Sequence, residues 1–397
     1  MPWKESDAVS ERMQFVARLG QGERMTDLCR EFGISRKTGY KLRDRYATNG
    51  SAGLYDQSRR PRHNPNRTPG TIAERVISIR QRYPTWGPKK LKQRLHDLEP
   101  EIKWPAASTI GAIIRDAGLV TGRKRRRRTP PSPAPRRESE APNELWCMDF
   151  KGQFRMGNRS YCYPLTVSDH FSRFLLGCEA LDSTKLVPAA QALETVFREH
   201  GLPDAMRSDN GTPFASTGRC GLTTLSVWLM RLHIRLERIE PGHPEQNGRH
   251  ERMHRTLKAE ATRPAGKNLL QQQERFDRFC AIYNHERPHE ALDMKTPAVV
   301  HTKSPRPLPP KLDELTYPLH DTTARVHANG VIRRRGRKQT YVATSLVGQR
   351  LGLRQVDDGT WLVSFMELDL GYIDDETNRL IQINNQANPK VSPMSPV

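Results

Sequence analysis

Three acidic residues, far apart along the chain, lie in local sequences that suit metal-assisted chemistry. Asp149 stands in L-W-C-M-D-F, an apolar and aromatic run typical of a buried strand. Asp209 lies between A-M-R-S and N-G-T-P-F, where a strand runs into a turn. Glu251 follows P-G-H-P-E-Q-N-G-R-H, which predicts a loop leading into a helix. Carboxylate oxygens are the ligands that Mg²⁺ and Mn²⁺ prefer, so these residues are candidate metal ligands.

The helix that begins near Glu251 also carries cations. Glu251, Arg255 and Lys258 fall at i, i+4 and i+7, which places them on one helical face. A carboxylate beside two cations suits a divalent metal held next to a phosphate chain. Gln246 and Asn247, in the preceding loop, are weaker candidates for contact with the end of a DNA strand.

Simpler interpretations exist for each of these residues. An Asp at a strand end is usually a turn or capping residue, and a helical Glu is usually solvated. Glu245 competes with Glu251 for the third position, although it lies in the loop. His250 and His254 are spaced i, i+4 with His243 nearby, but the pattern lacks a Glu at its second position and an obvious third ligand, so zinc is not predicted.

The order and flanks of the acidic residues resemble a known family. Asp149, the S-D-N-G-T-P-F around Asp209 and the H-P-E-Q-N-G-R-H-E ending on Glu251 resemble the catalytic core of retroviral-integrase-like DDE transposases encoded by bacterial insertion sequences. The later Y-N-H-E-R-P-H-E-A-L-D-M-K-T-P is similar to the segment that follows this core in the family. The resemblance implies an α/β ribonuclease-H-like core, expected over residues 144–303 with a trailing helix.

The resemblance also implies a reaction. Asp149, Asp209 and Glu251 would be both the catalytic residues and the ligands of two Mg²⁺ ions, with Mn²⁺ as a substitute. Water would first nick the end of the element and free a 3′-OH, which would then attack another strand. The expected partners are double-stranded DNA, as element ends with terminal inverted repeats and as target, and at least one further copy of this chain. Asp169, in D-H-F-S-R, resembles a family position for which a structural role is expected.

Charge and cysteine usage agree with a nucleic-acid partner inside the cell. The 397 residues carry 65 Lys and Arg against 44 Asp and Glu, a net charge of +21. Such a field favours an anionic polymer, although a ribosomal or membrane-surface partner would need the same charge. The six cysteines form no C-x-x-C pair, and we found no signal peptide or membrane span in the sequence. We therefore predict a cytoplasmic, nucleoid-associated bacterial protein.

The N-terminal part is expected to read DNA. Helical periodicity over residues 1–50, with Thr26 and Ser35 as helix caps and Gly33 at a tight turn, predicts a helix-turn-helix. A basic linker at 51–70 precedes a second helix-turn-helix at 71–120, with Pro88 in a first turn and Ser108 as a cap. A basic, Pro-rich linker follows at 121–143. The candidate DNA contacts here are Ser35, Arg36, Lys37, Thr38, Tyr40, Lys41, Ser108, Thr109, Arg123, Lys124, Arg125, Arg126, Arg127 and Arg128.

Beyond the core, a linker at 304–310 leads to a segment with strand periodicity. Short strands with Gly turns over 311–383 predict a small β-barrel, followed by a disordered tail at 384–397. The basic residues expected to contact phosphate in this domain are Arg333, Arg334, Arg335, Arg337 and Lys338. The whole chain is thus predicted to be multidomain: two all-α DNA readers, an α/β core and a small barrel.

Two rival interpretations remain open at this point. A helix-turn-helix regulator or an inactive transposase relic would bind DNA without cutting it, but a relic is expected to have lost at least one of the carboxylates or its flanks. A ribonuclease H acting on hybrids would share the fold and metals, but it needs neither the N-terminal DNA readers nor a basic C-terminal domain. A cleavage assay that compares a hybrid with an element end separates these classes.

Overall fold

A computed structural model of the chain describes residues 8–56, 68–120, 138–216, 218, 221–240, 244–334 and 339–383. The chain divides between Thr68 and Pro69 into two compact units, which are described separately. The predicted DNA contacts Arg123, Lys124, Arg125, Arg126, Arg127, Arg128, Arg335, Arg337 and Lys338, together with His243 and the predicted tail, lie outside the described residues. None of the described helices is long and apolar enough to cross a membrane.

The first unit is a helix-turn-helix. Its helices are α1 (Ala8–Gly20), α2 (Met25–Glu31) and α3 (Arg36–Asn49), followed by a 3-10 turn, η1 (Gly50–Leu54). Phe15, Leu28 and Leu42 from the three helices pack with Leu54 from that turn. Ser35 caps α3 as predicted, because its hydroxyl accepts a hydrogen bond of 3.2 Å from the Thr38 amide.

The tight turn of this unit also agrees with the sequence, but one cap does not. Gly33 has a φ of 64°, in the left-handed region that favours glycine, between α2 and α3. The predicted cap at Thr26 is wrong, because α2 begins one residue earlier and Arg24 occupies the cap position. No side-chain hydrogen bond caps α2.

The second unit begins with another three-helix module, made of α4 (Gly70–Arg82), α5 (Pro88–Leu98) and α6 (Ala107–Asp116). Val76, Trp86, Leu91 and Ile110 are buried in its core. Pro88 occupies the first turn of α5 as predicted, where its missing N–H costs no hydrogen bond. Ser108 is not a cap, because α6 already begins at Ala107 and no side chain caps this helix.

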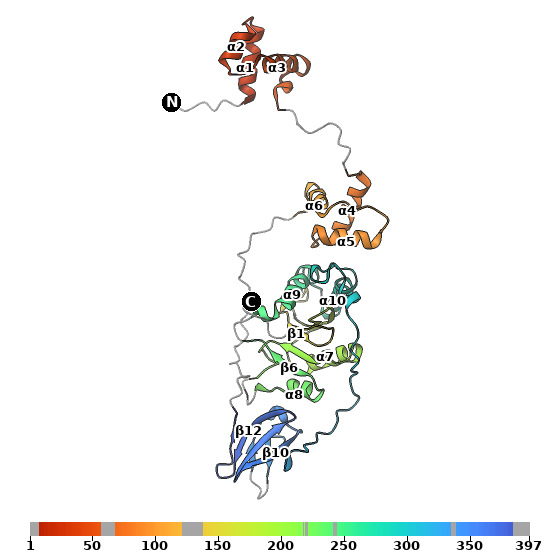
Figure 1. Ribbon diagram of the computed structural model, residues 1–397, viewed down its shortest axis with the longest axis vertical. Coiled ribbons are helices and arrows are strands. Elements are labelled where there is room, and N and C mark those ends of the chain that lie inside the picture. The colour runs from red at the N-terminus through yellow and green to blue at the C-terminus, as the bar shows by residue number, and fades with distance from the viewer. Residues whose placement is uncertain are drawn as a thin grey trace. The chain divides into compact units, whose positions relative to one another are not determined.

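The catalytic-core region is a mixed sheet covered by helices. Its elements are β1 (Trp146–Phe150), β2 (Phe154–Arg155), β3 (Tyr161–Asp169), β4 (Leu175–Leu181), α7 (Leu186–His200), β5 (Ala205–Ser208), α8 (Thr224–Arg231), β6 (Arg235–Arg238), η3 (Pro244–Asn247), α9 (Gly248–Glu260), α10 (Leu269–His285), η4 (Glu290–Leu292) and α11 (Pro297–Val300). Figure 1 shows them coloured from yellow through green to cyan.

The pairing of the strands places β1 at the centre of this sheet. β3 pairs antiparallel with both β1 and β4, whereas β5 pairs parallel with both β1 and β6. An antiparallel meander followed by parallel strands is the arrangement expected of a ribonuclease-H-like core. The parallel pairing of β1 and β5 brings the carboxyl ends of two neighbouring strands together at one edge of the sheet.

The two faces of the core sheet are buried by different helices. Trp146, Met148 and Val167 share an apolar cluster with Leu193 of α7 and Leu229 of α8. On the other side, Met253 and Leu257 of α9 pack in a second cluster with Phe276 and Phe279 of α10. Because side chains alternate along a strand, Asp149 lies on the opposite face from Met148, which is the face of α9.

The C-terminal domain is a β-structure, but a closed barrel is not confirmed. β7 (Thr322–Arg325), β10 (Arg350–Asp357), β11 (Thr360–Phe365), β12 (Leu368–Asp374) and β13 (Leu380–Ile381) form one sheet in the order β13-β12-β11-β10-β7. Within the described residues no pairing joins β13 to β7. The basic segment of this domain contains β8 (Val331–Arg333) and β9 (Gln339–Tyr341), which pair with each other. These strands are blue in Figure 1.

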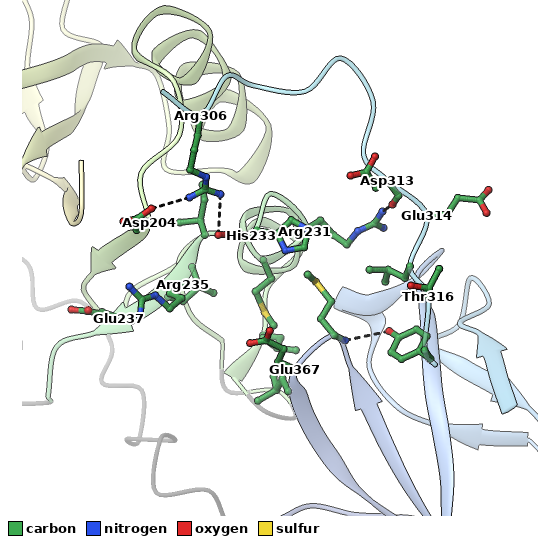
Figure 2. Close-up of a pocket in the computed structure, with 18 of the residues that line it drawn as sticks. Asp204, Arg231, His233, Arg235, Glu237, Arg306, Asp313, Glu314, Thr316 and Glu367 are labelled. Carbon is green, nitrogen blue, oxygen red and sulfur yellow. Dashed lines mark hydrogen bonds and ion pairs between the residues drawn. The ribbon is translucent and has the colours of Figure 1, made fainter. Parts of the chain in front are cut away.

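The chain between core and C-terminal sheet is held to both. Arg306 donates to the carbonyls of Pro203 at 2.7 Å and Leu232 at 2.9 Å, and Figure 2 shows it directed at Asp204 and His233. The Tyr317 hydroxyl donates to the Arg350 carbonyl at 2.7 Å. A cleft lies between these contacts, lined by β6 and by residues 313–320, and none of Asp149, Asp209 and Glu251 lines it.

Candidate active site

The three predicted carboxylates come from three elements that meet at one edge of the sheet. Asp149 is on the central strand β1, and Asp209 directly follows the neighbouring parallel strand β5. Glu251 is in the first turn of α9 and is exposed. The charges of both Asp209 and Glu251 act on Asp149. The strand pairing therefore brings Asp149 and Asp209 to one edge of the sheet, and Glu251 is near enough for its charge to act on Asp149.

Burial and mutual repulsion disfavour the charged form of the two aspartates. Burial, followed by the Asp209 carboxylate and then Glu251, raises the pKa of Asp149 well above its usual range. Burial also raises the pKa of Asp209, although the Gly211 amide opposes this by donating to its Oδ1 at 3.1 Å. Carboxylates that repel one another in a partly buried site are well suited to a cation, which removes the repulsion.

The turn that presents Asp209 is tied to the rest of the core. The side-chain amide of Asn210 donates to the Ile239 carbonyl at 2.7 Å, which joins this turn to the end of β6. Arg207, buried on β5, forms an ion pair of 2.9 Å with Glu237 and donates to the Gln246 carbonyl at 3.3 Å. The segment that leads into α9 is therefore attached to the two strands beside Asp209.

The predicted loop residues Gln246 and Asn247 are engaged with the protein. The side-chain oxygen of Gln246 accepts a hydrogen bond of 2.9 Å from the Glu240 amide. Asn247 is only 5% exposed, and its Oδ1 has no hydrogen-bond partner within the described part of the chain. The side chain of Glu245, the rival third carboxylate, lies outside the description.

Cations flank the carboxylates, and one of them was missed by the sequence analysis. Lys258 and Arg255 are exposed on α9, as the helical spacing predicts. Lys151, two residues after Asp149, lies close to both Asp149 and Lys258. Burial and then the Lys258 ammonium lower the pKa of Lys151, while Asp149 raises it. The signal in the sequence was the position of Lys151 directly after the strand that carries Asp149.

Asp169 has the structural role that the sequence predicted. Its carboxylate, 1% exposed at the end of β3, accepts hydrogen bonds from the Asn143 amide at 2.9 Å and from the Ser172 amide and hydroxyl at 2.7 and 2.6 Å. These bonds fix the turn after β3. Asp169 is therefore a structural carboxylate rather than a fourth member of the site.

The two histidines of the H-x-x-x-H pattern are buried beneath Glu251. His254 Nδ1 lies 3.7 Å from the Asp149 carboxylate, and both imidazoles contact the Thr166 hydroxyl at 2.7 Å. Burial lowers the pKa of His250 to about 3 and the pKa of His254 well below its usual range, so both rings are neutral near pH 7. Across the described residues, no three His, Cys, Asp or Glu side chains are arranged to hold a metal ion as they stand.

The predicted DNA contacts differ in accessibility. Ser35, Arg36, Lys37, Thr38, Tyr40 and Lys41 are all exposed on or beside α3, and Ser108 is exposed on α6 where Thr109 is half-buried. Arg333 is exposed, but the Arg334 guanidinium is mostly buried and pairs with Asp375 at 2.6 Å. Of these two arginines of the C-terminal sheet, Arg333 is the accessible one.

Family models match the two parts of the chain that carry these features. Integrase core domain models match residues 139–244 and 232–297, which contain Asp149, Asp209 and Glu251. A helix-turn-helix domain model matches residues 11–62, and a homeodomain-like model matches 38–114. The homeodomain-like match ends within α6, so the two matches together cover residues of both N-terminal modules.

Two of the relatives that align with more than half of this chain are insertion-element proteins. A 31.7 kDa protein of insertion element IS407 from Burkholderia multivorans is 27% identical over 59% of this chain and 82% of its own length. A 39.2 kDa protein of IS476 from Xanthomonas euvesicatoria is 28% identical over 60% and 67%, respectively. These matches support an insertion-sequence transposase of the retroviral-integrase-like family. The putative transposase y4bF of Sinorhizobium fredii is also similar, with 26% identity over 62% of this chain and 54% of its own length.

Similarity to solved structures is weaker and adds nothing to this assignment. The catalytic core domain of HTLV-2 integrase in complex with magnesium aligns with 42% of the transposase and all of its own chain, at 16% identity and a TM-score of 0.34. The fold of the transposase core follows instead from its own strand pairing and helix packing.

The raised pKa of Asp149 predicts how stability changes with pH when divalent ions are absent. The folded state holds the Asp149 proton more tightly than the unfolded chain, so its contribution to stability falls as pH rises from about 4 through the folded-state pKa. Asp149→Asn removes this titration. In urea unfolding with EDTA, the free energy of unfolding of Asp149→Asn should increase relative to that of wild type as pH rises. A difference in unfolding free energy that stays constant with pH would contradict the raised pKa of Asp149.

Proposed function

We propose that this transposase cuts and joins DNA by phosphoryl transfer at a site built from Asp149, Asp209 and Glu251. The observation that supports the proposal is the parallel pairing of β1 with β5, which carries Asp149 and Asp209 to one edge of the sheet. Glu251 on α9 is near enough for its charge to act on Asp149, and α9 also carries exposed cations. A DNA phosphate is the substrate group that this combination of charges fits.

The carboxylates fit the divalent metal that the family implies. All three ligands offer oxygen, which suits Mg²⁺ or Mn²⁺ rather than zinc. When bound, such ions supply Lewis-acid stabilisation of the attacking and departing oxygens, and two per site is the number that we propose. Because the described side chains do not form a finished cage, Glu251 is expected to change rotamer, or α9 to shift, when ions and DNA enter.

The protein side chains have separate tasks in the reaction. Asp149 and Asp209 would hold the divalent ions rigidly through their carboxylate oxygens, since one lies on the central strand and the other directly follows its neighbour. Lys151, Lys258 and Arg255 neutralise the DNA phosphates that flank the cut bond. In the first step water attacks the phosphorus, the P–O3′ bond breaks and a 3′-OH is released. In the second step that 3′-OH attacks a phosphodiester of another strand, whose own P–O3′ bond breaks.

The N-terminal modules are proposed to recognise the ends of the element. Two helix-turn-helix units read a longer DNA site than one, which suits a terminal inverted repeat. Joining two ends in one event requires two active sites to meet, so we propose at least a dimer on DNA.

A cleavage assay tests the proposed function. Inverted repeats found in the DNA that flanks the gene supply the substrate, and purified protein with Mg²⁺ should nick the end of this repeat and join it to a second duplex. A matched RNA–DNA hybrid should remain uncut. Preferential cutting of the hybrid would assign a ribonuclease H instead, and binding of the repeat without any cutting would assign a regulator or relic.

Exposed cations on α3 should set the salt dependence of DNA binding. Each phosphate contact contributes about 0.9 to the slope of log affinity against log salt concentration. Lys37→Ala and Lys41→Ala should therefore each lower the steepness of that slope by about one. Fluorescence anisotropy with the repeat duplex measures the slope. Arg24→Ala, exposed in the same unit before α2, is the matched control, and an equal effect of all three changes would argue against α3 as the DNA-facing helix.

A further inference from the structure

Four buried polar side chains join α9 to the strand opposite Asp149. Thr166 and Ser168 on β3 are 0% and 7% exposed, and His250 and His254 on α9 are 2% and 6% exposed. They are one helical turn apart on the helix and two residues apart on the strand, so all four face one another. We call these four residues the Thr166 cluster.

The donors and acceptors of the Thr166 cluster can be assigned from its contacts. The Thr166 hydroxyl has one proton, which it donates to the Asp149 backbone carbonyl at 3.0 Å. Its two lone pairs then accept from His250 Nε2 and His254 Nε2, each at 2.7 Å. His250 Nδ1 accepts from the Ser168 hydroxyl, also at 2.7 Å. This assignment satisfies every one of these contacts at once.

The cluster also accounts for the H-x-x-x-H pattern in the sequence. Both Nε2 atoms converge on a hydroxyl oxygen, and their rings lie edge to face with centroids 4.6 Å apart. The one ring nitrogen that this assignment leaves over is His254 Nδ1, which faces Asp149 at 3.7 Å. The two histidines therefore bind the helix to the sheet rather than a zinc ion.

Thr166 occupies the position from which it can align two candidate ligands. In the β1–β3 ladder it is paired directly with Asp149, and it also bonds to that residue's carbonyl. Glu251 lies between the two histidines on α9, next to His250 and three residues before His254. A single hydroxyl thus links the strand that carries Asp149 to the helix turn that carries Glu251.

We propose that Thr166, through His250 and His254, is a positioning residue that sets Glu251 against Asp149 for binding of divalent ions. This inference rests on the proposed function, because it assumes that these carboxylates share ions. Apolar packing of Met253 and Leu257 holds α9 on the sheet. Such packing does not fix the rotation of α9 about its own axis as accurately as ion binding requires. The directional bonds of the cluster supply that specification.

Thr166→Val tests the proposal, because valine keeps the shape of threonine and removes only the hydroxyl. We expect Mn²⁺ affinity, followed by the electron paramagnetic resonance signal of free Mn²⁺, to fall about tenfold or more. The Mg²⁺ concentration for half-maximal cleavage should rise by a similar factor, with a smaller loss at saturating Mg²⁺. Thr166→Ser, which restores the hydroxyl, should recover Mn²⁺ affinity to within about threefold.

Thr340→Val is the matched control. Thr340 is also 0% exposed, and its hydroxyl donates to Asn378 at 2.7 Å in the C-terminal sheet. This variant should lose stability without any change in Mn²⁺ affinity. If Thr166→Val does not fold, Thr166→Ser and Ser168→Ala decide: the serine should bind Mn²⁺ nearly as wild type does, and the alanine, which removes the partner of His250, should bind it several-fold more weakly.

The outcomes separate this inference from the proposed function. Equal Mn²⁺ affinity in wild type, Thr166→Val and Thr340→Val, or a serine variant as weak as the valine, would overturn the positioning role. In either case Asp149→Asn would still abolish cleavage if the proposed function is correct. Full cleavage by Asp149→Asn would instead overturn the proposed function itself.

Discussion

Replacing Asp149 with Asn should abolish strand cleavage and strand transfer while leaving DNA binding intact. The amide keeps the size of the carboxyl group but removes the negative charge that would hold the metal ions. Loss of several kcal/mol of transition-state stabilisation corresponds to a fall in rate of about 10³-fold or more. Affinity for the repeat duplex should stay within about twofold of wild type, because the N-terminal modules supply that affinity.

In the absence of divalent ions, the same replacement should raise the free energy of unfolding of the protein. Burial and the Asp209 carboxylate both disfavour the charged form of Asp149, and asparagine removes both penalties wherever the pH would charge that carboxyl. A stabilisation of about 1 kcal/mol would raise Tm by roughly 2–4 °C for a domain of this size. Cleavage assays with calorimetry in EDTA measure both effects. An inactive variant that is also less stable would indicate misfolding, and an active variant would remove Asp149 from the mechanism.

Glu251→Gln should be nearly as severe, and Glu245→Gln should not. Glu251 is placed on the first turn of α9 above the buried histidines, where its charge acts on Asp149. Because it is exposed, its replacement should change stability little and cleavage by about 10³-fold or more. The two substitutions are chemically identical and lie in neighbouring elements, so they are matched controls for one another.

The comparison of the two glutamates has a clear contrary outcome. If Glu245→Gln lost cleavage and Glu251→Gln kept it, the third ligand would come from η3 instead of α9. The Thr166 cluster would then align the wrong residue, and its effect on Mn²⁺ affinity should disappear as well.

Local sequence patterns predicted the core elements because burial dominates them. The apolar run around Asp149 leaves few alternatives once one side must face a core. Ser35 was recognisable as a cap because serine precedes a clear helix. Thr26 and Ser108 failed as caps because each helix starts before them, where tertiary packing, and not the capping residue, decides the first turn.

The C-terminal domain and its basic strand could not be derived from composition alone. Strand periodicity indicates short strands but not whether the last pairs with the first, and here the described strands form an open sheet with a separate hairpin. A run of arginines predicts a phosphate-binding face, but the Arg334 side chain is mostly buried and binds Asp375 and Asn378. The two partners that decide this, Asp375 and Asn378, lie 41 and 44 residues away in sequence.

Some residues of the candidate site could likewise be predicted from the sequence, and others could not. Asp149 and Asp209 were predicted from strand ends and Glu251 from the loop-to-helix pattern, and their role as metal ligands stays a prediction. Thr166 could not be identified, since only the β1–β3 register places it beside Asp149 and only the packing of α9 brings the histidines to it. Lys151 likewise has meaning only once Lys258 lies nearby.

Anomalous diffraction from crystals of the transposase with Mn²⁺ and the repeat duplex tests the central claim most directly. We expect Mn²⁺ peaks within coordination distance of carboxylate oxygens from Asp149, Asp209 and Glu251, beside the phosphate to be cut. Peaks bound by other residues, or an active crystal complex in which these three carboxylates share no ion, would contradict it.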